Sequence, residues 1–390
     1  MAAKPLRVLE LRTVRGTGGG PDKTILQGTA LTDRERYDVT ICYIRDARDP
    51  VFDIDRRARQ LPVRYVEVVE QHSLDRRIWP ALRQLVRDLE IEIVHGHDYK
   101  TNLLALLLAW ADGLVAVSTA HGWVGTGRRE RLLYFPLDRL QQRFFAHVVA
   151  VSSDVRDSIV ARGADPDRVS VVLNGVDPSR FRRMPGRRAD SRATFNLPAD
   201  AVVIGSVGRL EQEKNFGLLI RAFARVRDQV DGAVLVIAGD GSQKELLGQQ
   251  IASLGLSAHV RLLGLIDNVV TLHHALDVYV QSSDAEGTAN SVLEALALET
   301  PLVATDVGGT TEVARHGCEA LIVAKGDEAG LVESILQVIR HPEAASVRAG
   351  NGRIRVETEL SFARRTQRIE SMYDQVASKA GLRAPASVHA

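Results

Sequence analysis

The sequence predicts an α/β protein with two doubly wound halves, each a parallel sheet covered by helices. At 390 residues the chain is longer than one ordinary hydrophobic core accommodates, so two domains are expected. Short runs rich in Val, Ile and Leu alternate with helix-length amphipathic segments, which is typical of parallel strands joined by crossover helices. A stretch rich in arginine and proline separates the two sets of apolar runs. Such sheets bind ligands outside the carboxyl ends of their strands, so a cleft between two facing halves is the expected site.

The first domain is predicted over residues 1–178. Helical patterns fit between most of its apolar runs, for example at 76–89, 101–111 and 153–162. The runs that predict its strands are "LRVLEL" (6–11), "YDVTICYI" (37–44), "VRYVEVV" (63–69), "IEIVHG" (91–96), "GLVAVSTA" (113–120), "HVVAVSS" (147–153) and "VSVVLNG" (169–175).

A linker is predicted over 179–199, because "PSRFRRMPGRRADSR" (178–192) has six arginines, two prolines and no apolar periodicity. The second domain is predicted over 200–360. Its strands are predicted from "AVVIGSVG" (201–208), "AVLVIAG" (233–239), "VRLLG" (260–264), "DVYVQSS" (277–283), "PLVATDVG" (301–308) and "EALIVAKG" (319–326). Three helices are predicted to close the chain, near 327–340, 342–357 and 361–378.

The composition excludes several classes of partner and site. Lys and Arg number 50 against 49 Asp and Glu, so no nucleic-acid partner is expected. The two cysteines, Cys42 and Cys318, suggest neither a disulfide framework nor a zinc cluster. The start of the chain lacks the hydrophobic region of a signal peptide, and the longest apolar run, 103–111, is about half a membrane span. A cytoplasmic location is therefore expected.

Two loops that follow predicted strands have the residues of a phosphate site. In "RGTGGGPDK" (15–23), Gly19 and Gly20 allow a close backbone approach to a ligand, although a flexible turn explains them too. The dinucleotide pattern G-x-G-x-x-G fails there, because Pro21 stands at the position of its last glycine. In "GSVGRLEQEKNF" (205–216), Arg209 and Lys214 suit a diphosphate; the alternative is two solvated cations beside glutamates.

The stretch "EGTANSVLEALA" (286–297) contains two glutamates eight residues apart. Gly287 ends any helix continuing from Glu286, and the polar residues that follow predict a new helix starting near 288–291. The positive end of that helix would face a phosphate. Glu294, one turn in, would accept hydrogen bonds from ribose hydroxyls, whereas Glu286 would face the other end of the ligand. A capped amphipathic helix with exposed glutamates explains the spacing alone, but not the glycine loops and basic residues.

Taken together, these residues resemble a known family. "EGTANSVLEALA" is similar to the E-x7-E motif of retaining glycosyltransferases with the GT-B fold, specifically glycosyltransferase family 4. "GRLEQEKN" resembles that family's phosphate loop. Further matches, in the family's order, are "AHGW" (120–123), "VSS" (151–153), "LNGVD" (173–177) and "VIAGDG" (236–241).

The resemblance implies a metal-independent hexosyl- or related transferase that retains anomeric configuration and needs no cofactor. Its co-substrate would be a nucleotide-diphosphate sugar, UDP- or GDP-linked, and its acceptor a hydroxyl of a saccharide or lipid-linked molecule. Bacterial-type polysaccharide, lipopolysaccharide or glycolipid synthesis is the implied setting. The fold would be two Rossmann-like domains facing across a cleft, with the last helix, 361–378, returning to complete the first.

The resemblance also implies roles for residues of this chain. Arg209 and Lys214 would neutralise the donor diphosphate, and Glu294 would bind the nucleotide ribose. Glu286 would contact hydroxyls of the donor sugar, and His121 would lie beside that sugar. The implied catalytic residues are His121, Arg209, Lys214 and Glu286. The implied nucleotide-sugar-binding residues are Gly19, Gly20, Arg209, Lys214, Gly239, Glu286, Thr288, Ala289, Asn290, Ser291 and Glu294. Two departures from the family's usual pattern, "GGGPDK" and the Thr288–Ala289 pair, leave the donor and acceptor unidentified.

Several alternatives remain open at this point. A sugar-nucleotide 2-epimerase shares the two-domain architecture, and a nucleotide-sugar sensor would bind without turnover. A lone His121 is often only hydrogen-bonded structure, and "VHGHDYK" (94–100) ranks as structural or acceptor-side. "DID" (53–55) and "HH" (273–274) are weak metal patterns. The stretch 127–146, rich in arginine and phenylalanine, suits peripheral contact with the inner face of a membrane, or is an ordinary crossover helix with a solvated face.

Overall fold

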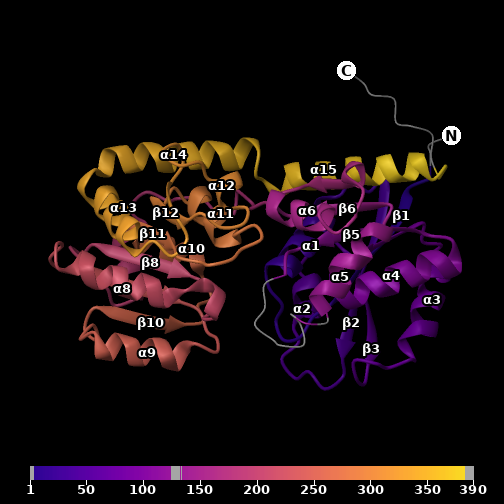
Figure 1. The fold of residues 1–390 in the computed structure, drawn as a ribbon, viewed down its shortest axis with the longest axis horizontal. Helices are drawn as coiled ribbons and strands as arrows, with labels where there is room; N and C mark the ends of the chain where they lie inside the picture. The colour runs from indigo at the N-terminus through magenta and orange to yellow at the C-terminus, as the bar shows by residue number, and fades with distance from the viewer. Residues whose placement is uncertain (1–3, 124–131, 133, 383–390) are drawn as a thin grey trace. The chain divides into compact units, whose positions relative to one another are not determined.

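The computed structural model describes residues 4–123, 132 and 134–382 (Figure 1). The chain divides into two compact units, of which one comprises Met1–Asn174 with Phe362–Ala390 and the other Gly175–Ser361. Each unit is a parallel sheet with helices packed against it. This confirms the predicted α/β class with two Rossmann-like halves.

The first unit contains a seven-stranded parallel sheet in the order β3-β2-β1-β4-β5-β6-β7. Each strand falls within or close to an apolar run of the sequence, because a strand buried on both faces is apolar almost throughout. The strands are β1 (Leu6–Thr13), β2 (Tyr37–Asp46), β3 (Arg64–Glu70), β4 (Ile93–Gly96), β5 (Val115–Ala120), β6 (His147–Ala150) and β7 (Val169–Val171).

Helices cover both faces of this sheet, since alternate residues of each strand enter different cores. Leu9 and Leu11 of β1 join the core shared with α3 and α4, whereas Leu6 and Val8 join the core shared with α15. The helices of the unit are α1 (Gly20–Leu31), α2 (Ile54–Ala58), α3 (Ile78–Asp88), α4 (Tyr99–Asp112), α5 (Phe135–Gln141), α6 (Ser153–Val160) and α15 (Phe362–Lys379).

The second unit repeats the strand order around its own central strand: β10-β9-β8-β11-β12-β13. Its strands are β8 (Val203–Val207), β9 (Val234–Ala238), β10 (Val260–Gly264), β11 (Val278–Gln281), β12 (Leu302–Thr305) and β13 (Leu321–Val323). Its helices are α7 (Arg187–Thr194), α8 (Phe216–Arg227), α9 (Lys244–Ser253), α10 (Val269–Ala275), α11 (Asn290–Ala297), α12 (Thr310–Val313), α13 (Glu328–Arg340) and α14 (Pro342–Thr358).

The strand order places a switch point in each sheet, where successive crossovers leave in opposite directions and loops splay apart. In the first unit it lies between β1 and β4, and in the second between β8 and β11. The loops of Gly19, Lys214 and Glu286 leave the carboxyl ends of β1, β8 and β11. No helix within the described residues has both the length and the apolar character needed to cross a bilayer.

Candidate active site

The switch point of the second unit brings together two residues that lie far apart in the sequence. Lys214 ends the short 3₁₀ turn after β8, and Glu286 lies in the loop after β11. The Lys214 ammonium Nζ is 2.6 Å from Glu286 Oε1, and both side chains are mostly buried. The loop lysine and the first glutamate of the E-x7-E stretch therefore share one site at the carboxyl edge of the sheet.

Hydrogen bonds within and between these two loops fix the positions of Glu286 and Lys214. Ser283 Oγ donates to Glu286 Oε1 over 2.6 Å, which fixes the carboxylate from its own loop. Asn215 has a left-handed backbone with φ of 46° and caps α8 by accepting from the Leu218 amide. Its Nδ2 also donates to Asp284 over 3.1 Å. Asn215 thus positions Lys214 next to it, a role that sequence reasoning missed although "KN" ends the motif.

Two glycines allow neighbouring backbone segments of the site to approach each other closely. A Cβ on Gly239, where φ is +146°, would lie 1.8 Å from the Gly208 carbonyl oxygen at the end of β8. A Cβ on Gly308, where φ is +51°, would lie 2.0 Å from the carbonyl oxygen of Glu286. Only glycine fits either position. Gly239 was expected in the binding set, whereas Gly308, at the end of "PLVATDVG" (301–308), was not.

Helix α11 begins at Asn290, within the predicted range 288–291. The N-cap is Ala289, whose side chain makes no capping hydrogen bond. Thr288 is buried just before the helix, and Ser291 lies in its first turn. Glu294 is half-buried one turn further along, as its place in the motif predicts.

Arg209 has a different environment from Lys214. Its guanidinium donates to Glu213 Oε1 over 2.8 Å, and 66% of its side chain is exposed. This is the arrangement of a solvated cation beside a glutamate. The structure therefore joins Lys214 to Glu286 but leaves Arg209 at the rim of the same loop.

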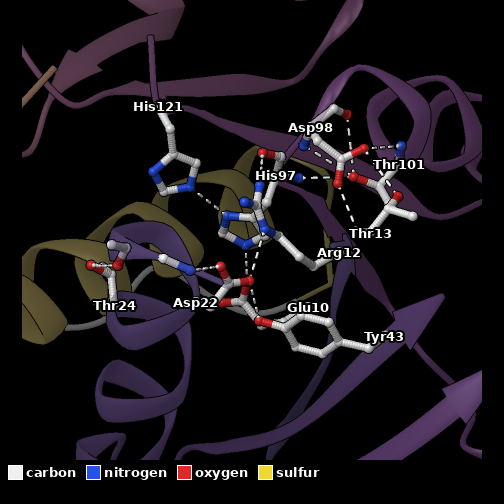
Figure 2. Close-up of polar contacts among 12 residues, drawn as sticks. Glu10, Arg12, Thr13, Asp22, Thr24, Tyr43, His97, Asp98, Thr101 and His121 are labelled. Carbon is white, nitrogen blue, oxygen red and sulfur yellow. Dashed lines mark hydrogen bonds and ion pairs between the residues drawn. The ribbon is translucent and has the colours of Figure 1, made fainter. Parts of the chain in front are cut away.

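In the first unit, three side chains from neighbouring strands form a hydrogen-bonded row (Figure 2). Glu10 lies on β1, His97 follows β4 and His121 follows β5. His97 Nε2 contacts Glu10 Oε2, and His97 Nδ1 is 3.1 Å from His121 Nε2. Glu10 and His97 are almost fully buried. His121 thus lies beside His97, at the carboxyl edge of the sheet.

Burial sets the protonation of these histidines. Loss of water lowers the pKa of His97 to about 4, against the opposing effect of Glu10. Burial, and then the neighbouring His97, lower the pKa of His121 well below its ordinary value. Burial disfavours the Glu10 carboxylate, yet the His95 and His97 rings beside it keep the pKa of Glu10 well below its usual range. Both His97 and His121 are therefore neutral at pH 7.

The glycine loop after β1 is held by Asp22 (Figure 2). The Gly19 amide donates to Asp22 Oδ2 over 2.7 Å, while Arg12 and Tyr43 donate to Oδ1 over 3.1 and 2.8 Å. Burial raises the pKa of Asp22, but Arg12 and these donors lower it overall. Gly19 is the N-cap of α1, and Pro21 lies in its first turn. Asp22, which carries no motif signal, is what shapes the loop of Gly19 and Gly20.

Glu10, His95 and His97 bring atoms of the kind that bind metal within 4.8 Å of one another. Each of these atoms already has a protein partner. His95 Nε2 and Nδ1 lie 2.7 Å from Thr119 Oγ1 and from Tyr373 Oη, which also donates to Glu10 Oε1 over 2.7 Å. The cluster is a complete hydrogen-bond network, and its ring nitrogens are occupied.

The two weak metal patterns of the sequence are engaged in local structure. Asp53 precedes α2 and Asp55 lies within it, where they pair with Arg56 and Arg59 over 3.0 and 2.7 Å. In α10, His273 hydrogen-bonds Thr300 Oγ1 over 3.0 Å, and His274 Nε2 accepts from the Met184 amide over 2.9 Å. The two histidines face different partners, as adjacent helical residues must.

Comparison with known proteins assigns the chain to a family. The profile described as "Glycosyltransferase Family 4" matches residues 19–180, and that described as "Glycosyl transferases group 1" matches residues 187–355. Glycogen synthase of Mycobacterium tuberculosis is 30% identical over 305 residues, which are 75% of this chain and 70% of that protein. A UDP-Gal:alpha-D-GlcNAc-diphosphoundecaprenol alpha-1,3-galactosyltransferase of Escherichia coli is 23% identical over 372 residues, 92% of this chain and 95% of that protein.

A likeness to solved structures extends over almost the whole chain. HepE from Anabaena, solved in complex with UDP-glucose, aligns with a TM-score of 0.83 at 20% identity and covers 95% of this chain and 100% of its own. These matches do not favour an epimerase or a sensor. The protein is a glycosyltransferase of family 4, and its two Rossmann-like units form the GT-B fold.

Proposed function

We propose that this glycosyltransferase moves a sugar from a nucleotide-diphosphate sugar to a hydroxyl acceptor, with retention of anomeric configuration and without a metal ion. The observation that carries the proposal is the Lys214–Glu286 pair at the switch point of the second unit, beside the start of α11. A UDP- or GDP-sugar is the proposed donor, supported by the UDP-glucose in HepE and the UDP-Gal in the name of the Escherichia coli relative. That relative also supports a role in bacterial-type polysaccharide, lipopolysaccharide or glycolipid synthesis.

The chemistry of the proposed step explains the residues at this site. Breaking the bond between sugar and phosphate leaves negative charge on the departing diphosphate, and fixed positive groups aimed at that charge lower the barrier. Lys214 and the positive end of α11 supply such groups, and Arg209 supplies a further guanidinium from the rim of the loop. A diphosphate arriving beside Lys214 would compete with Glu286 for the ammonium group. Glu286 would then accept hydrogen bonds from the donor sugar.

The remaining residues have proposed roles around the donor. Glu294, about one turn into α11, would accept from the ribose hydroxyls of the nucleotide, and the loop of Gly239 would leave room for the backbone to approach it. His121 would lie beside the donor sugar. Gly19 and Gly20 would approach the phosphate or the acceptor. Each assignment rests on the position of the residue at a carboxyl strand end and on the matching motif order.

Two parts of the proposed mechanism can be tested separately: retention, from the anomeric configuration of the product, and metal independence, from activity in the presence of EDTA. Same-face attack by the acceptor hydroxyl, assisted by the leaving phosphate, would give a product with the anomeric configuration of the donor, which NMR coupling constants measure. A glycosyl adduct trapped on Glu286 would instead indicate a carboxylate nucleophile. Full activity in excess EDTA is expected, since Lys214 and the helix end replace a cation, and loss of activity restored by a divalent ion would contradict this.

The test of the function is a panel of UDP-, GDP- and ADP-sugars with saccharide and lipid-linked acceptors, scored for a new glycosidic bond. With the active donor, Lys214→Ala is expected to lower turnover about 100-fold or more, because one fixed positive group at the leaving charge is lost. Lys325→Ala, at an exposed turn of the same unit, is the matched control and is expected to keep wild-type turnover. Near wild-type turnover of Lys214→Ala would contradict the proposed role.

We further propose contact with the inner face of a membrane through the first unit, consistent with a lipid-linked acceptor. Of the predicted segment 127–146, residues 127–131 and 133 lie outside the described residues. The helices α4 and α5 pack together, and Tyr99 stacks on Tyr134 with ring centroids 4.7 Å apart. Together with the 3₁₀ turn Gln142–Phe144 that follows α5, they expose six large apolar side chains, called here the α4–α5 patch: Leu103, Leu107, Trp110, Leu137, Leu140 and Phe144.

Charge next to the α4–α5 patch favours an anionic lipid surface. The guanidinium of the exposed Arg143 lies 5.3 Å from the centre of the Phe144 ring, so an apolar side chain and a cation meet at one end of the patch. Trp110 is 86% exposed on α4, although tryptophan usually buries most of its surface. Exposed aromatic and leucine side chains beside arginine are the composition of an interfacial helix.

A further inference from the structure

Glu10 is a buried carboxylate that the proposed reaction does not use. A carboxylate deprived of water is costly unless hydrogen bonds satisfy it. Its two oxygens contact His97 Nε2 and Tyr373 Oη, and His97 in turn contacts His121 (Figure 2). We propose that Glu10 and His97 are positioning residues that hold His121 in one tautomer, with its proton on Nε2 and an unprotonated Nδ1 available as a hydrogen-bond acceptor.

The direction of each proton follows from the chemistry of Glu10. An ionised carboxylate only accepts hydrogen bonds, so His97 Nε2 carries a proton and donates it. A neutral imidazole has one donor and one acceptor nitrogen, so His97 Nδ1 is the acceptor. The nitrogen facing it, His121 Nε2 at 3.1 Å, must then carry the proton of that ring. His121 Nδ1 is left as an acceptor.

The second oxygen of Glu10 fits the same scheme. Burial raises the pKa of Tyr373 well above its ordinary value, so its hydroxyl stays protonated and donates to Glu10 Oε1. The hydroxyl then accepts from His95 Nδ1, and Thr119 Oγ1 donates to His95 Nε2. Each hydrogen bond of the network then has one donor and one acceptor, so the contacts are compatible with a single arrangement of tautomers.

The environment of the row keeps His97 and His121 neutral. The charged groups facing them from the packed elements are Glu10 and Arg12 on β1 and Arg365 on α15. The Arg365 guanidinium is buried, and it lines with Glu10, His97 and Tyr373 a cavity of about 20 Å³, which has room for one water molecule. The positive charges of Arg12 and Arg365 disfavour protonation of either histidine.

The consequence for the reaction rests on the proposed function. No described residue hydrogen-bonds His121 Nδ1, and Figure 2 shows this nitrogen pointing away from His97. An acceptor at that position recognises a hydroxyl group, which donates, and repels a carbonyl or carboxylate oxygen. The row therefore selects for a sugar that presents a hydroxyl to His121.

A direct test of the tautomer uses NMR of the full-length protein labelled with ¹⁵N-histidine, without any substrate. The His121 signals are assigned by their loss in His121→Ala. The ¹⁵N shifts are expected to show a neutral ring protonated on Nε2 at pH 7.5. A ring protonated on Nδ1, or one averaged between the two tautomers, would overturn the proposal whether or not the protein transfers sugar.

Two variants of His97 separate its two contacts. His97→Gln places an amide where Nε2 lies, so it keeps a donor to Glu10 but removes the acceptor for His121. His97→Asn places an amide oxygen where Nδ1 lies, so it keeps the acceptor for His121 but loses Glu10. His97→Gln is expected to average the His121 tautomers and lower kcat/KM of donor hydrolysis about tenfold, the value of roughly one hydrogen bond. His97→Asn is expected to keep the His121 ring protonated on Nε2 and to lower kcat/KM less than His97→Gln does.

His147→Gln is the matched control, because His147 is a buried histidine on β6 of the same sheet that hydrogen-bonds Ser170 Oγ over 2.8 Å and does not contact the row. It is expected to leave the His121 spectrum unchanged. Equal losses of kcat/KM in His97→Gln and His97→Asn, with the His121 spectrum of wild type in both, would show that His97 is structural only and would overturn the proposal. Absence of transfer by wild type with an Nε2-protonated His121 would refute the function and leave the row supported.

Discussion

At the scale of single residues, His273 makes the stability of the second unit depend on pH. Burial lowers its pKa to about 3, because the ring lies in the core and stacks on Tyr279 with ring centroids 5.0 Å apart. An unfolded histidine has a pKa of about 6.5, so between about pH 6.5 and 3 the unfolded chain binds a proton that the folded one does not. The contribution of His273 to the free energy of unfolding is therefore expected to fall as pH decreases through this range, by about 1.4 kcal/mol for each pH unit.

His273→Phe removes this titration while keeping a ring beside Tyr279. It is expected to cost about 1 kcal/mol at pH 7.5 through loss of the Thr300 hydrogen bond, and to reduce the fall in stability between pH 6.5 and 4.5. Calorimetry at a series of pH values measures both effects. His341→Phe, at an exposed position of the same unit, should keep the wild-type slope. An unchanged slope in His273→Phe would contradict the assignment.

A substitution of Gly239 is expected to strain the backbone of the second unit. An alanine there would adopt a backbone with φ of +146° and meet the Gly208 carbonyl oxygen. The backbone strain alone is about 1–3 kcal/mol, so Gly239→Ala is expected to lower the melting temperature of the second unit and to weaken donor binding. Gly248→Ala is the control, since it lies inside α9 with nothing within 4 Å of the added Cβ, and it is expected to gain about 0.5–1 kcal/mol. Thermal unfolding of both variants decides the point.

The residues of the candidate site could be predicted only where a motif announced them. Lys214 and Glu286 stand in recognisable loops, and the structure brings them together. Glu10 gave no signal, because a single glutamate inside "LRVLEL" resembles an ordinary polar position of a strand. Its partner Tyr373 is 363 residues away on the last helix, and only the tertiary fold pairs them. Asp22 and Asn215 were missed as well, because each positions a loop through hydrogen bonds that only the folded chain brings together.

At the scale of elements, the apolar runs predicted every strand of the two sheets, because each buried parallel strand needs one. Helix α7 was missed, since "RRADSRAT" is polar throughout and resembles a linker. It is held instead by Arg192, whose buried guanidinium donates to the Ala275 carbonyl oxygen over 3.2 Å and pairs with Asp277 over 2.7 Å. A helix anchored by one arginine has no hydrophobic periodicity to detect.

The exposed Trp110 of helix α4 provides the test of membrane contact. Trp110→Ser is expected to weaken binding to anionic phospholipid vesicles about tenfold or more, because burying such a side chain in the interface contributes roughly 1.5–3 kcal/mol. Co-sedimentation at low and high salt measures the effect, and wild-type binding should weaken as salt rises. Leu246→Ser removes an exposed apolar side chain from α9, outside the patch, and should bind as wild type. Wild-type protein that fails to bind at low salt would refute the contact.

At the scale of the whole molecule, neither unit is a simple half of the sequence. The chain completes the second unit and then returns to the first through α15, drawn in yellow in Figure 1. Five side chains of this helix complete the core on one face of the first sheet; the four larger apolar side chains among them are at 369, 372, 373 and 376, and the fifth is Ala377. Polar contacts add to them: Tyr37 donates to Asp374 over 2.7 Å, and the Asp33 amide donates to Glu370 over 2.8 Å.

Truncation after Ser361 is therefore expected to unfold the first unit and spare the second. Each of the four apolar side chains contributes roughly 1.5–3 kcal/mol of burial, so their sum is comparable with the whole stability of a domain, about 5–15 kcal/mol. Calorimetry should show loss of one transition and retention of the other, and limited proteolysis should leave a fragment corresponding to 175–361. Truncation after Leu382, which keeps α15, is the control and should preserve both transitions. An intact first unit in the chain truncated after Ser361 would show that α15 is dispensable to the sheet it covers. The point substitution Tyr373→Phe should instead keep the fold. Because it removes the hydroxyl that donates to Glu10, it should disturb the His121 tautomer.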